Sequence, residues 1–545
     1  MLNRRFSAIL LVVALVLPAL ASPSSARAQD GGNILWPTEG WSASTPEQQG
    51  MSSEKLAGLW PMLVGGTSDS SFGIPSPAGN STYIHTALVI RHGNAVLDAS
   101  VYPFSNDQPH EMYSTTKGVV STLVGIAIDQ GYIKSTAQSI WDFFPKSETA
   151  NMDDQKAAIT LHHLLTHTSG LNIGIPTATG QWDTGGKTYT QYVLDSPMET
   201  APGSTYKYQD GNADLVSEIL QEATGMTAFD FAQQNLFGSL GITDAAWAAD
   251  PEGVNWGGWG LAISGYDLAK LGYLFLHRGM WDGKQIVSSD WVTASINDQL
   301  EPLQPHFWEG YSNYWYDGPI GFWFNEPEGK NAQYRGFAAF GWGMQILVVV
   351  PDLDLIMVTT GDMLSASLFT ALTSYIIPSI ESDQALSDNP TAYEQLQAAV
   401  TVTEEPTPSA AISLPADAQT ISGKTYTLAD NLAGWKSLSV TFSGNEASLK
   451  IGFRDTQLEF PVGLDGVFRV SSVGMPVDPI FWSHPNVPVA IKGTWLDDQT
   501  FSMELWDLMG NQGFVITIPV NTLEISVVPV LFQEMAMTIQ ATPQP

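Results

Sequence analysis

A segment rich in threonine, glutamate, proline, serine and alanine divides this chain of 545 residues into two parts with different hydrophobic patterns. The segment, residues 401–415, has the composition of a linker. Strand-like and helical patterns alternate before it, whereas short strands and turns follow one another after it. The sequence therefore predicts a mixed domain at 29–400 and a β-rich domain at 416–535, because 545 residues are too many for one core.

The first domain begins and ends with strands. A strand-like run at Thr86–Arg91 comes early, and a hairpin formed by Met344–Val350 and Leu355–Thr360 comes late. Helical patterns between them are expected at Lys117–Gln130, Leu161–Thr168, Asn212–Ala223 and Tyr266–His277. The order predicts an α+β domain whose sheet is assembled from both ends of the segment around a helical insertion.

The second domain consists of short strand patterns separated by turns. The expected strands are 438–442, 447–453, 457–462, 467–472, 489–495, 501–506 and 513–519. This spacing predicts an all-β barrel or sandwich. No catalytic group of residues is evident in it, so it is interpreted as a binding, lid or stability module.

The first 28 residues have the pattern of a signal peptide. Arg4 and Arg5 precede an apolar run at Ala8–Leu20, and Ala26-Arg27-Ala28 offers a cleavage site. No later apolar run is long enough to span a membrane. We therefore expect a secreted or periplasmic protein without membrane insertion after the signal is removed.

The composition excludes several classes of function. The chain has no cysteine, so neither disulfides nor thiolate metal sites support the fold. Its formal net charge of −33 argues against nucleic acid or an anionic membrane as a partner. The expected partner is a small molecule, and the oligomeric state is left open.

Ser114 and Lys117 form an S-x-x-K motif at the start of an apolar helical run. Residues i and i+3 share one face of a helix, and a desolvated lysine can act as the base for a serine nucleophile. The motif recurs at Ser52–Lys55, but there it lies in a polar segment and is interpreted as an ordinary helix start capped by Ser52 or Ser53. The context makes Ser114 the candidate nucleophile.

Such a serine also needs a group that transfers protons at the leaving atom. Tyr208 precedes the helical pattern that starts at Asn212 and could supply a phenol. An aromatic residue at this position is also typical of packing on the following helix. From the residues alone, both interpretations stay open.

Several ordered blocks resemble the serine β-lactamase and penicillin-binding-protein superfamily, in particular the class C-like branch with family VIII esterases, D-aminopeptidases and 6-aminohexanoate-oligomer hydrolases. The resemblance covers about residues 41–361. It is carried by Ser114–Lys117, His162–Leu171, Tyr206–Asn212, Trp259–Leu261, Tyr266–Gly272 and Gly341–Gln345. It implies an antiparallel sheet flanked by helices, no cofactor, and a serine hydrolase that cleaves an ester or amide through an acyl-enzyme.

The resemblance also assigns roles to individual residues. Ser114 would be the nucleophile, Lys117 its base and Tyr208 the proton shuttle, with the backbone N–H groups of Ser114 and Trp342 as the oxyanion hole. Asp210 and Gly341 would contact substrate. For Tyr208 the family motif adds to the open interpretation above, and the oxyanion and substrate roles come from the family motifs alone.

Two positions depart from the family pattern. Asp210 replaces the asparagine of Tyr-x-Asn, and Ala339 stands where the third motif often has lysine or histidine. A carboxylate-bearing substrate such as a penicillin would lack its usual cation. The resemblance therefore favours smaller or less acidic acyl compounds, with a D-alanyl carboxypeptidase-like peptidase ranked second.

Histidines and aromatic residues offer further candidates. His163 and His167 stand four apart, but Leu164 replaces the glutamate of a zinc-protease signature, and no metal is expected. An aromatic group could form core or line a cleft, with Trp315 the candidate for substrate contact. Its members are Trp308, Tyr311, Tyr314, Trp315, Tyr316, Phe322 and Trp323.

Other functions remain as alternatives. A penicillin-sensing or wall-binding protein would bind or acylate with little turnover, consistent with Asp210 and Ala339. A glycoside hydrolase with two carboxylates has no local signature and stays possible. An α/β-hydrolase is disfavoured because the chain lacks a G-x-S-x-G elbow.

Overall fold

The computed structural model describes residues 34–65, 84–174, 184–297, 310–320, 331, 333–362, 370–409, 414–431, 433–475, 484, 487–510, 513–522, 524–529 and 536–544. By its contacts the chain separates into a short unit, Met1–Leu35, and a second unit, Trp36–Pro545, that contains all the elements below. The predicted signal peptide, 1–28, lies outside the described residues.

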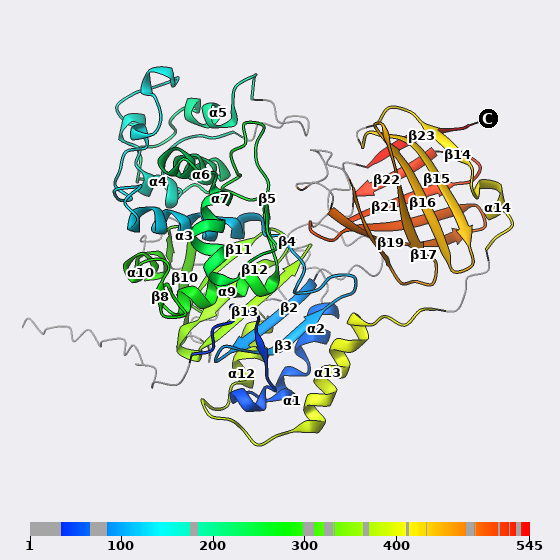
Figure 1. Cartoon of the computed structure of the whole chain (residues 1–545), viewed down its shortest axis with the longest axis horizontal. Coiled ribbons are helices and arrows are strands. Elements are labelled where there is room, and N and C mark those ends of the chain that lie inside the picture. The colour runs from blue at the N-terminus through cyan, green and yellow to red at the C-terminus, as the bar shows by residue number, and fades with distance from the viewer. Residues whose placement is uncertain are drawn as a thin grey trace, which may run out of the picture. The chain divides into compact units, whose positions relative to one another are not determined.

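An eight-stranded sheet forms the centre of the first domain (Figure 1). Its order is β1 (Ser42–Ala43), β3 (Asn94–Ser100), β2 (Ile84–Arg91), β13 (Leu355–Gly361), β12 (Gln345–Val350), β11 (Arg335–Gly341), β10 (Trp315–Pro319) and β9 (Gly310–Ser312). Every pair is antiparallel except β1 with β3. The central pair joins β2 to β13, so the sheet is assembled from both ends of the domain, as predicted.

Helices cover both faces of this sheet. For this reason β2, β12 and β13 are buried along their whole length. One face packs on α1 (Ser53–Leu56), α2 (Leu59–Gly65), α12 (Ile377–Ser379) and α13 (Pro390–Glu404). The other packs on α9 (Gly265–Leu276), where a Cβ on Gly272 would lie 2.8 Å from a methyl carbon of Leu347. A larger residue at this position would require the Leu347 side chain to move.

The helical insertion lies between β3 and β9 in the chain. It contains α3 (Thr116–Asp129), α4 (Leu161–Leu165), α5 (Tyr189–Asp195), α6 (Asp210–Thr224), α7 (Ala228–Ala232), α8 (Gly238–Leu240), α9 and α10 (Ser289–Asn297). α6 packs on α3, α4 and α5. A small sheet of β4 (His110–Glu111), β6 (Leu261–Ile263) and β5 (Ala246–Trp247) joins the nucleophile segment to the segment before α9.

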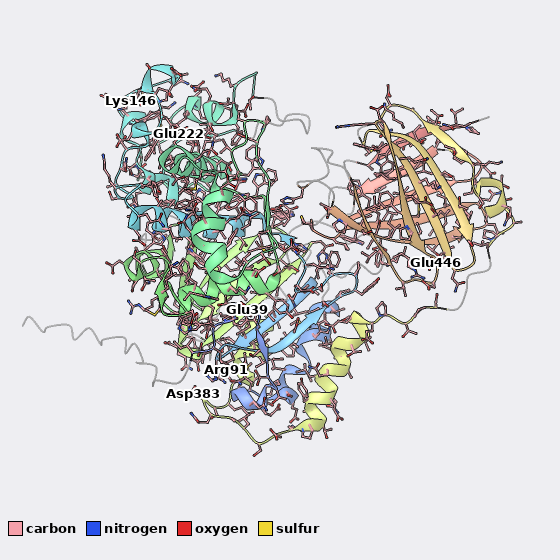
Figure 2. The ribbon with its side chains drawn as sticks, in the orientation of Figure 1. Glu39, Arg91, Lys146, Glu222, Asp383 and Glu446 are labelled. Carbon is pink, nitrogen blue, oxygen red and sulfur yellow. The ribbon has the colours of Figure 1, made fainter. Side chains whose placement is uncertain are left out.

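Arg91 ties distant segments together at the end of β2. Its guanidinium is fully buried and donates to the carbonyl oxygens of Gln49 at 2.7 Å and Ser382 at 2.9 Å. It also pairs with Asp383, with 3.4 Å between nitrogen and oxygen (Figure 2). The charge is therefore satisfied by carbonyl and carboxylate oxygens, as a buried cation requires.

The second domain is a β-barrel (Figure 1). Its strands are β14 (Thr425–Leu428), β15 (Trp435–Ser443), β16 (Glu446–Phe453), β17 (Thr456–Gly463), β18 (Arg469–Met475), β19 (Val487–Asp497), β20 (Thr500–Asp507), β21 (Gly513–Pro519), β22 (Glu524–Pro529) and β23 (Met537–Pro543), with α14 (Ala418–Ile421) before them. A parallel bridge between Gly463 and Lys492 closes the ring through β17 and β19. Alternating residues such as Leu449 and Ile451 fill its interior.

The predicted fold class is confirmed. For the all-β domain the sequence predicted a barrel or a sandwich, and the structure shows a barrel. The structure adds strands β9, β10, β11, β14, β22 and β23, which the sequence patterns did not indicate. The predicted linker at 401–415 begins inside α13, which ends at Glu404, and β23 lies beyond residue 535. Within the described ranges, no helix combines the length and apolar character needed to cross a bilayer.

Candidate active site

Ser114 lies in a tight turn that leads into a buried helix. The 3₁₀ turn Tyr113–Thr115 precedes α3, whose residues from Thr116 to Ala127 are all buried. Tyr113 has a φ of +44°, an unfavourable backbone conformation for a residue with a side chain. The strained turn leaves Ser114 half-buried at the start of the helix, accessible to a small molecule.

Three predicted residues meet at the Ser114 hydroxyl. The Tyr208 phenol donates to Ser114 Oγ at 2.7 Å. Lys117 Nζ donates to the same oxygen at 3.1 Å. The Lys117 ammonium also lies 4.8 Å from the centroid of the Tyr208 ring. The serine hydroxyl, the amine and the phenol therefore share one site, with groups 94 residues apart in sequence brought together.

Lys117 is buried, with 2 % of its surface exposed, and its ammonium has three acceptors. Besides Ser114 Oγ these are Asp210 Oδ1 at 2.7 Å and the Gly258 carbonyl at 2.7 Å. Burial by itself lowers the pKa of Lys117, but Tyr208 and the Asp210 carboxylate together outweigh it and the net pKa is raised. The sequence-based expectation of a pKa lowered by desolvation is wrong, because it did not include the ion pair.

Tyr208 is held by the segment that leads into α6. Its ring lies 4.6 Å from the buried ring of His167, and the residue is 40 % exposed. His167 Nδ1 lies 3.4 Å from the Gln209 amide nitrogen and 3.3 Å from Asn212 Nδ2. The His162–Leu171 block therefore supports the tyrosine, and burial keeps the pKa of His167 well below its usual value.

A second carboxylate lies one turn beyond Asp210 on α6. Asp214 is 6 % exposed, and its Oδ1 accepts from the Gly258 amide at 2.9 Å. Burial and the neighbouring Asp210 raise the pKa of Asp214 to about 7. Sequence reasoning did not identify Asp214 or Gly258, although the adjacent Trp259–Leu261 block was one of the family signals.

The end of β11 lies against the nucleophile turn. A Cβ on Gly341 would lie 2.3 Å from the carbonyl oxygen of Met112, and Thr115 Oγ1 donates to the Gln345 carbonyl at 2.7 Å. Trp342 follows directly, with its side chain 40 % exposed. The predicted oxyanion residues are therefore on neighbouring segments, and their role stays a prediction.

Trp315 is a core residue and is not exposed as predicted for a substrate contact. It is fully buried in β10, with its ring 4.3 Å from that of Phe275 and beneath Gly118 of α3. The indole of Trp315 fits beneath α3 because the residue of α3 that it contacts, Gly118, has no side chain. Tyr311 and Tyr314 are buried too, Tyr316 is half-buried, and Trp308, Phe322 and Trp323 lie outside the described residues.

The remaining histidine and serine candidates have local partners. His163 Nδ1 accepts from the Thr160 amide at 3.1 Å, as part of a helix cap, and so does not join His167. In the described part of the chain, no group of three or more metal-ligating side chains gathers. Ser52 caps α1 by accepting from the Lys55 amide, which confirms the interpretation of the second S-x-x-K copy.

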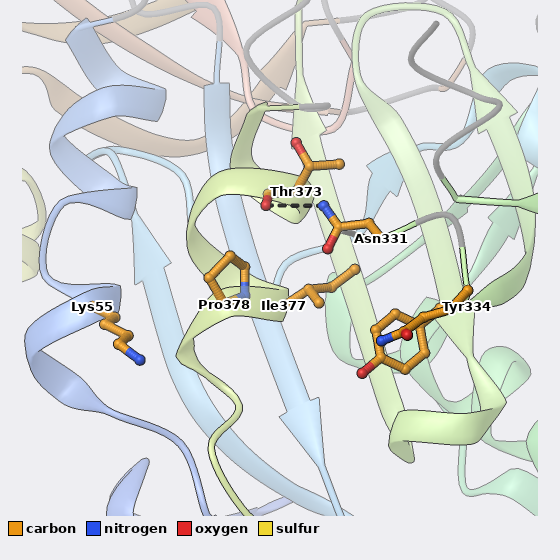
Figure 3. A pocket seen from close by; sticks show the side chains of 7 residues that line it. Lys55, Asn331, Tyr334, Thr373, Ile377 and Pro378 are labelled. Carbon is orange, nitrogen blue, oxygen red and sulfur yellow. Dashed lines mark hydrogen bonds between the residues drawn. The ribbon is translucent and has the colours of Figure 1, made fainter. Parts of the chain in front are cut away.

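A separate cavity lies away from these residues (Figure 3). Its lining includes Lys55 of α1, Tyr334, Thr373, and Ile377 and Pro378 of α12. Lys55 is already paired with Glu381 at 2.8 Å. None of the candidate catalytic residues contributes to it.

An antiparallel sheet flanked by helices, with an S-x-x-K serine that contacts a lysine and a tyrosine, defines the class of proteins built like serine β-lactamases. The profile of the Beta-lactamase family matches residues 85–361, about half of the chain, and the chain belongs to this family. The resemblance inferred from the sequence blocks is thereby confirmed.

Curated relatives include enzymes of different specificity. The chain is 28 % identical over 160 residues to acyltransferase mokF of Monascus pilosus, covering 26 % of this chain and 38 % of the relative. It is 24 % identical over 220 residues to 6-aminohexanoate-dimer hydrolase of Paenarthrobacter ureafaciens, covering 38 % and 56 %. It is 25 % identical over 183 residues to esterase EstB of Burkholderia gladioli, covering 31 % and 46 %. The matches thus span less than two thirds of these relatives.

Proposed function

We propose that the protein is an exported serine hydrolase that cleaves an ester or amide bond through an acyl-enzyme intermediate. The observation that carries this proposal is the position of Ser114 Oγ, 2.7 Å from the Tyr208 phenol and 3.1 Å from Lys117 Nζ. A nucleophile with a proton acceptor and a cation at hydrogen-bonding distance is the arrangement that activates serine. The esterase and amide hydrolase among the relatives support the same chemistry.

The proposed reaction has two steps. In the reactive form the Tyr208–Lys117 pair has given one proton to solvent, so that the proton of Ser114 Oγ passes to the pair when this oxygen attacks the acyl carbon. The collapse of the tetrahedral intermediate then releases the leaving group with that proton. Water then attacks the acyl-enzyme and gives up a proton to the same pair, and the pair returns this proton to Ser114 Oγ as the acid leaves. The backbone N–H groups of Ser114 and Trp342 are the proposed donors to the oxyanion.

The raised pKa of Lys117 influences how the proton moves. An amine with three acceptors, one of them a carboxylate, is an ammonium at neutral pH. We infer that Lys117 acts in the resting enzyme as a cation beside Tyr208, and that the phenol makes the first proton contact with Ser114. This refines the assignment of Lys117 as the sole base.

The charges around the site favour neutral acyl substrates. Asp210 is half-exposed beside Lys117, and Ala339 provides no cation on β11. Because the Lys117 ammonium is already paired with Asp210, a substrate carboxylate would find no unpaired cation among these groups. We therefore propose that the substrate is a small ester or amide without a nearby carboxylate. We also propose that the protein is exported and that residues 1–28 are removed.

The Ser114→Ala variant tests the function. It should fold like the parent protein, judged by circular dichroism, and lose hydrolysis of short p-nitrophenyl esters. A Ser52→Ala variant is the matched control, because Ser52 belongs to the other S-x-x-K copy and only caps α1. Unchanged turnover in Ser114→Ala would remove this serine from the mechanism.

The fate of the acyl group separates the remaining alternatives. Intact mass after incubation with a fluorophosphonate or a penicillin should show a single adduct on Ser114. A stable adduct without ester turnover would favour a sensor, and cleavage of D-alanyl peptides would favour a carboxypeptidase-like enzyme. Because one relative is named an acyltransferase, a further experiment adds an alcohol and measures whether it competes with water for the acyl group.

A further inference from the structure

One glycine loop, residues 257–260, contacts both halves of the site. A Cβ on Gly257 would lie 2.0 Å from the Ala213 carbonyl, and one on Gly258 would lie 2.9 Å from Asp210 Cβ. The loop therefore touches the first turns of α6 more closely than any side chain would allow. This contact directs the Gly258 carbonyl to Lys117 Nζ at 2.7 Å.

Two buried carboxylates hold the amides of this loop. Asp214 Oδ1 accepts from the Gly258 amide at 2.9 Å. Glu111 Oε1 accepts from the Gly260 amide at 2.8 Å and from the Tyr113 amide at 3.0 Å, so it also fixes the strained residue before Ser114. Both carboxylates are almost fully buried, and burying a charge requires such donors.

We propose that Asp214 and Glu111 are positioning residues of the active site. Through one glycine loop they orient the Lys117 ammonium and the nucleophile turn toward each other. Asp214 acts through the Gly258 amide, and Glu111 acts through the Gly260 and Tyr113 amides. The inference rests on the proposed hydrolase function, because it names what holds that site in place.

The charge of Asp214 gives this arrangement a pH dependence. The groups that face it are Lys117 from α3, Asp210 from α6, Tyr189 from α5 and Tyr314 from the turn before β10, besides the Gly257 and Gly258 amides. With Asp214 neutral, the Lys117–Asp210 pair has no net charge. Ionised Asp214 adds a negative charge, which opposes the oxyanion that forms at Ser114.

Full-length Asp214→Asn and Asp214→Ala variants test the proposal through the rate of labelling by a fluorophosphonate between pH 5.5 and 9. The asparagine side chain keeps an oxygen that can accept from the Gly258 amide, and it is always neutral. Its labelling rate should therefore be near that of the parent at low pH, and the change in rate that the ionisation of Asp214 causes near pH 7 should disappear. The alanine variant should label roughly 10- to 100-fold more slowly at every pH, because the loop is no longer held. Asp267→Asn is the control, since buried Asp267 contacts Ser264 and Lys270 instead.

Hydrogen exchange of the peptide spanning 256–261 provides a readout that does not depend on activity. Exchange there should rise in Asp214→Ala and Glu111→Ala but not in Asp267→Ala. Unchanged exchange, or labelling of Asp214→Ala at the rate of the parent, would overturn the positioning role. A parent protein that never labels at Ser114 would instead reject the proposed function, and the exchange result would still decide the role of the loop.

Discussion

At the scale of single residues, the Lys117–Asp210 pair has the largest influence on the chemistry of the site. The lysine is buried and its partner is half-exposed, so the pair lies at the boundary of protein and solvent. An ion pair of this kind raises the pKa of the amine and keeps it charged. The aspartate therefore shifts the balance between amine and phenol as proton acceptors.

Replacing Asp210 by asparagine should move the pH–rate profile. Without the carboxylate the Lys117–Tyr208 pair loses a proton more readily, so the acid limb of kcat/KM should shift to lower pH by about 1–2 units. Hydrolysis of a carboxylate-bearing cephalosporin should rise relative to a neutral ester, because Lys117 is then no longer paired with a carboxylate. A profile that superimposes on that of the parent would contradict the role of the pair. The control is Asp195→Asn, because the partner of Asp195, Lys187, is on the surface.

The sequence could predict part of this residue-scale picture. Ser114 and Lys117 are three apart, so local spacing suffices, and the family motif added Tyr208. The contacts of Asp214, Glu111 and Gly258 join segments up to 149 residues apart, and no local pattern encodes such pairs. Trp315 was misassigned because aromatic composition does not distinguish a core position from a cleft.

At the scale of elements, the site depends on how closely β11 approaches the nucleophile turn. Gly341 ends the strand where the Met112 carbonyl leaves no room for a side chain. Strand, turn and α3 are thereby packed together without an intervening layer. Small displacements of β11 would move Trp342 relative to Ser114.

A Gly341→Ala substitution should reduce activity more than stability. The added methyl would lie 2.3 Å from a backbone oxygen, which must shift. We expect kcat/KM for a p-nitrophenyl ester to fall roughly 10- to 100-fold. Gly65→Ala in α2, where nothing lies within 4 Å of the added Cβ, should leave the rate unchanged. Equal rates for both variants would show that the close approach is not needed.

Element prediction from the sequence succeeded where hydrophobic periodicity is strong. β2, β12, β13, α3, α6 and α9 were predicted within a few residues, since each is a long apolar or amphipathic run. β10 and β11 were missed because glycine and aromatic residues interrupt their alternation. β14 has four residues and was too short to stand out.

At the scale of the whole molecule, buried acids set the response to pH. Asp507 in the barrel is 2 % exposed, and its Oδ1 accepts from the Met509 and Gly510 amides. Burial is the largest influence and raises the pKa of Asp507 to about 7. Because the folded pKa exceeds the unfolded one, stability from this group is present at low pH and is lost as pH rises from about 4 to 7.

Asp507→Asn should therefore become more stable relative to the parent as pH rises. We expect the difference in unfolding free energy to increase by about 2 kcal/mol between pH 4.5 and pH 8. Thermal unfolding at both pH values measures it. Asp497→Asn is the control, because exposed Asp497 accepts from the Gln499 amide in a similar turn. A difference that is the same at both pH values would refute the expected ionisation.

The pairing of β2 with β13 also governs the order in which the molecule can be built. Thr86 and Thr360, whose hydroxyls lie 2.8 Å apart, are 274 residues apart in the chain. On the ribosome, the segment with Ser114 therefore emerges long before the strands that complete the sheet. A nascent chain cannot acquire a finished reaction centre until β11, β12 and β13 have left the exit tunnel, which delays reactivity until the domain is nearly complete.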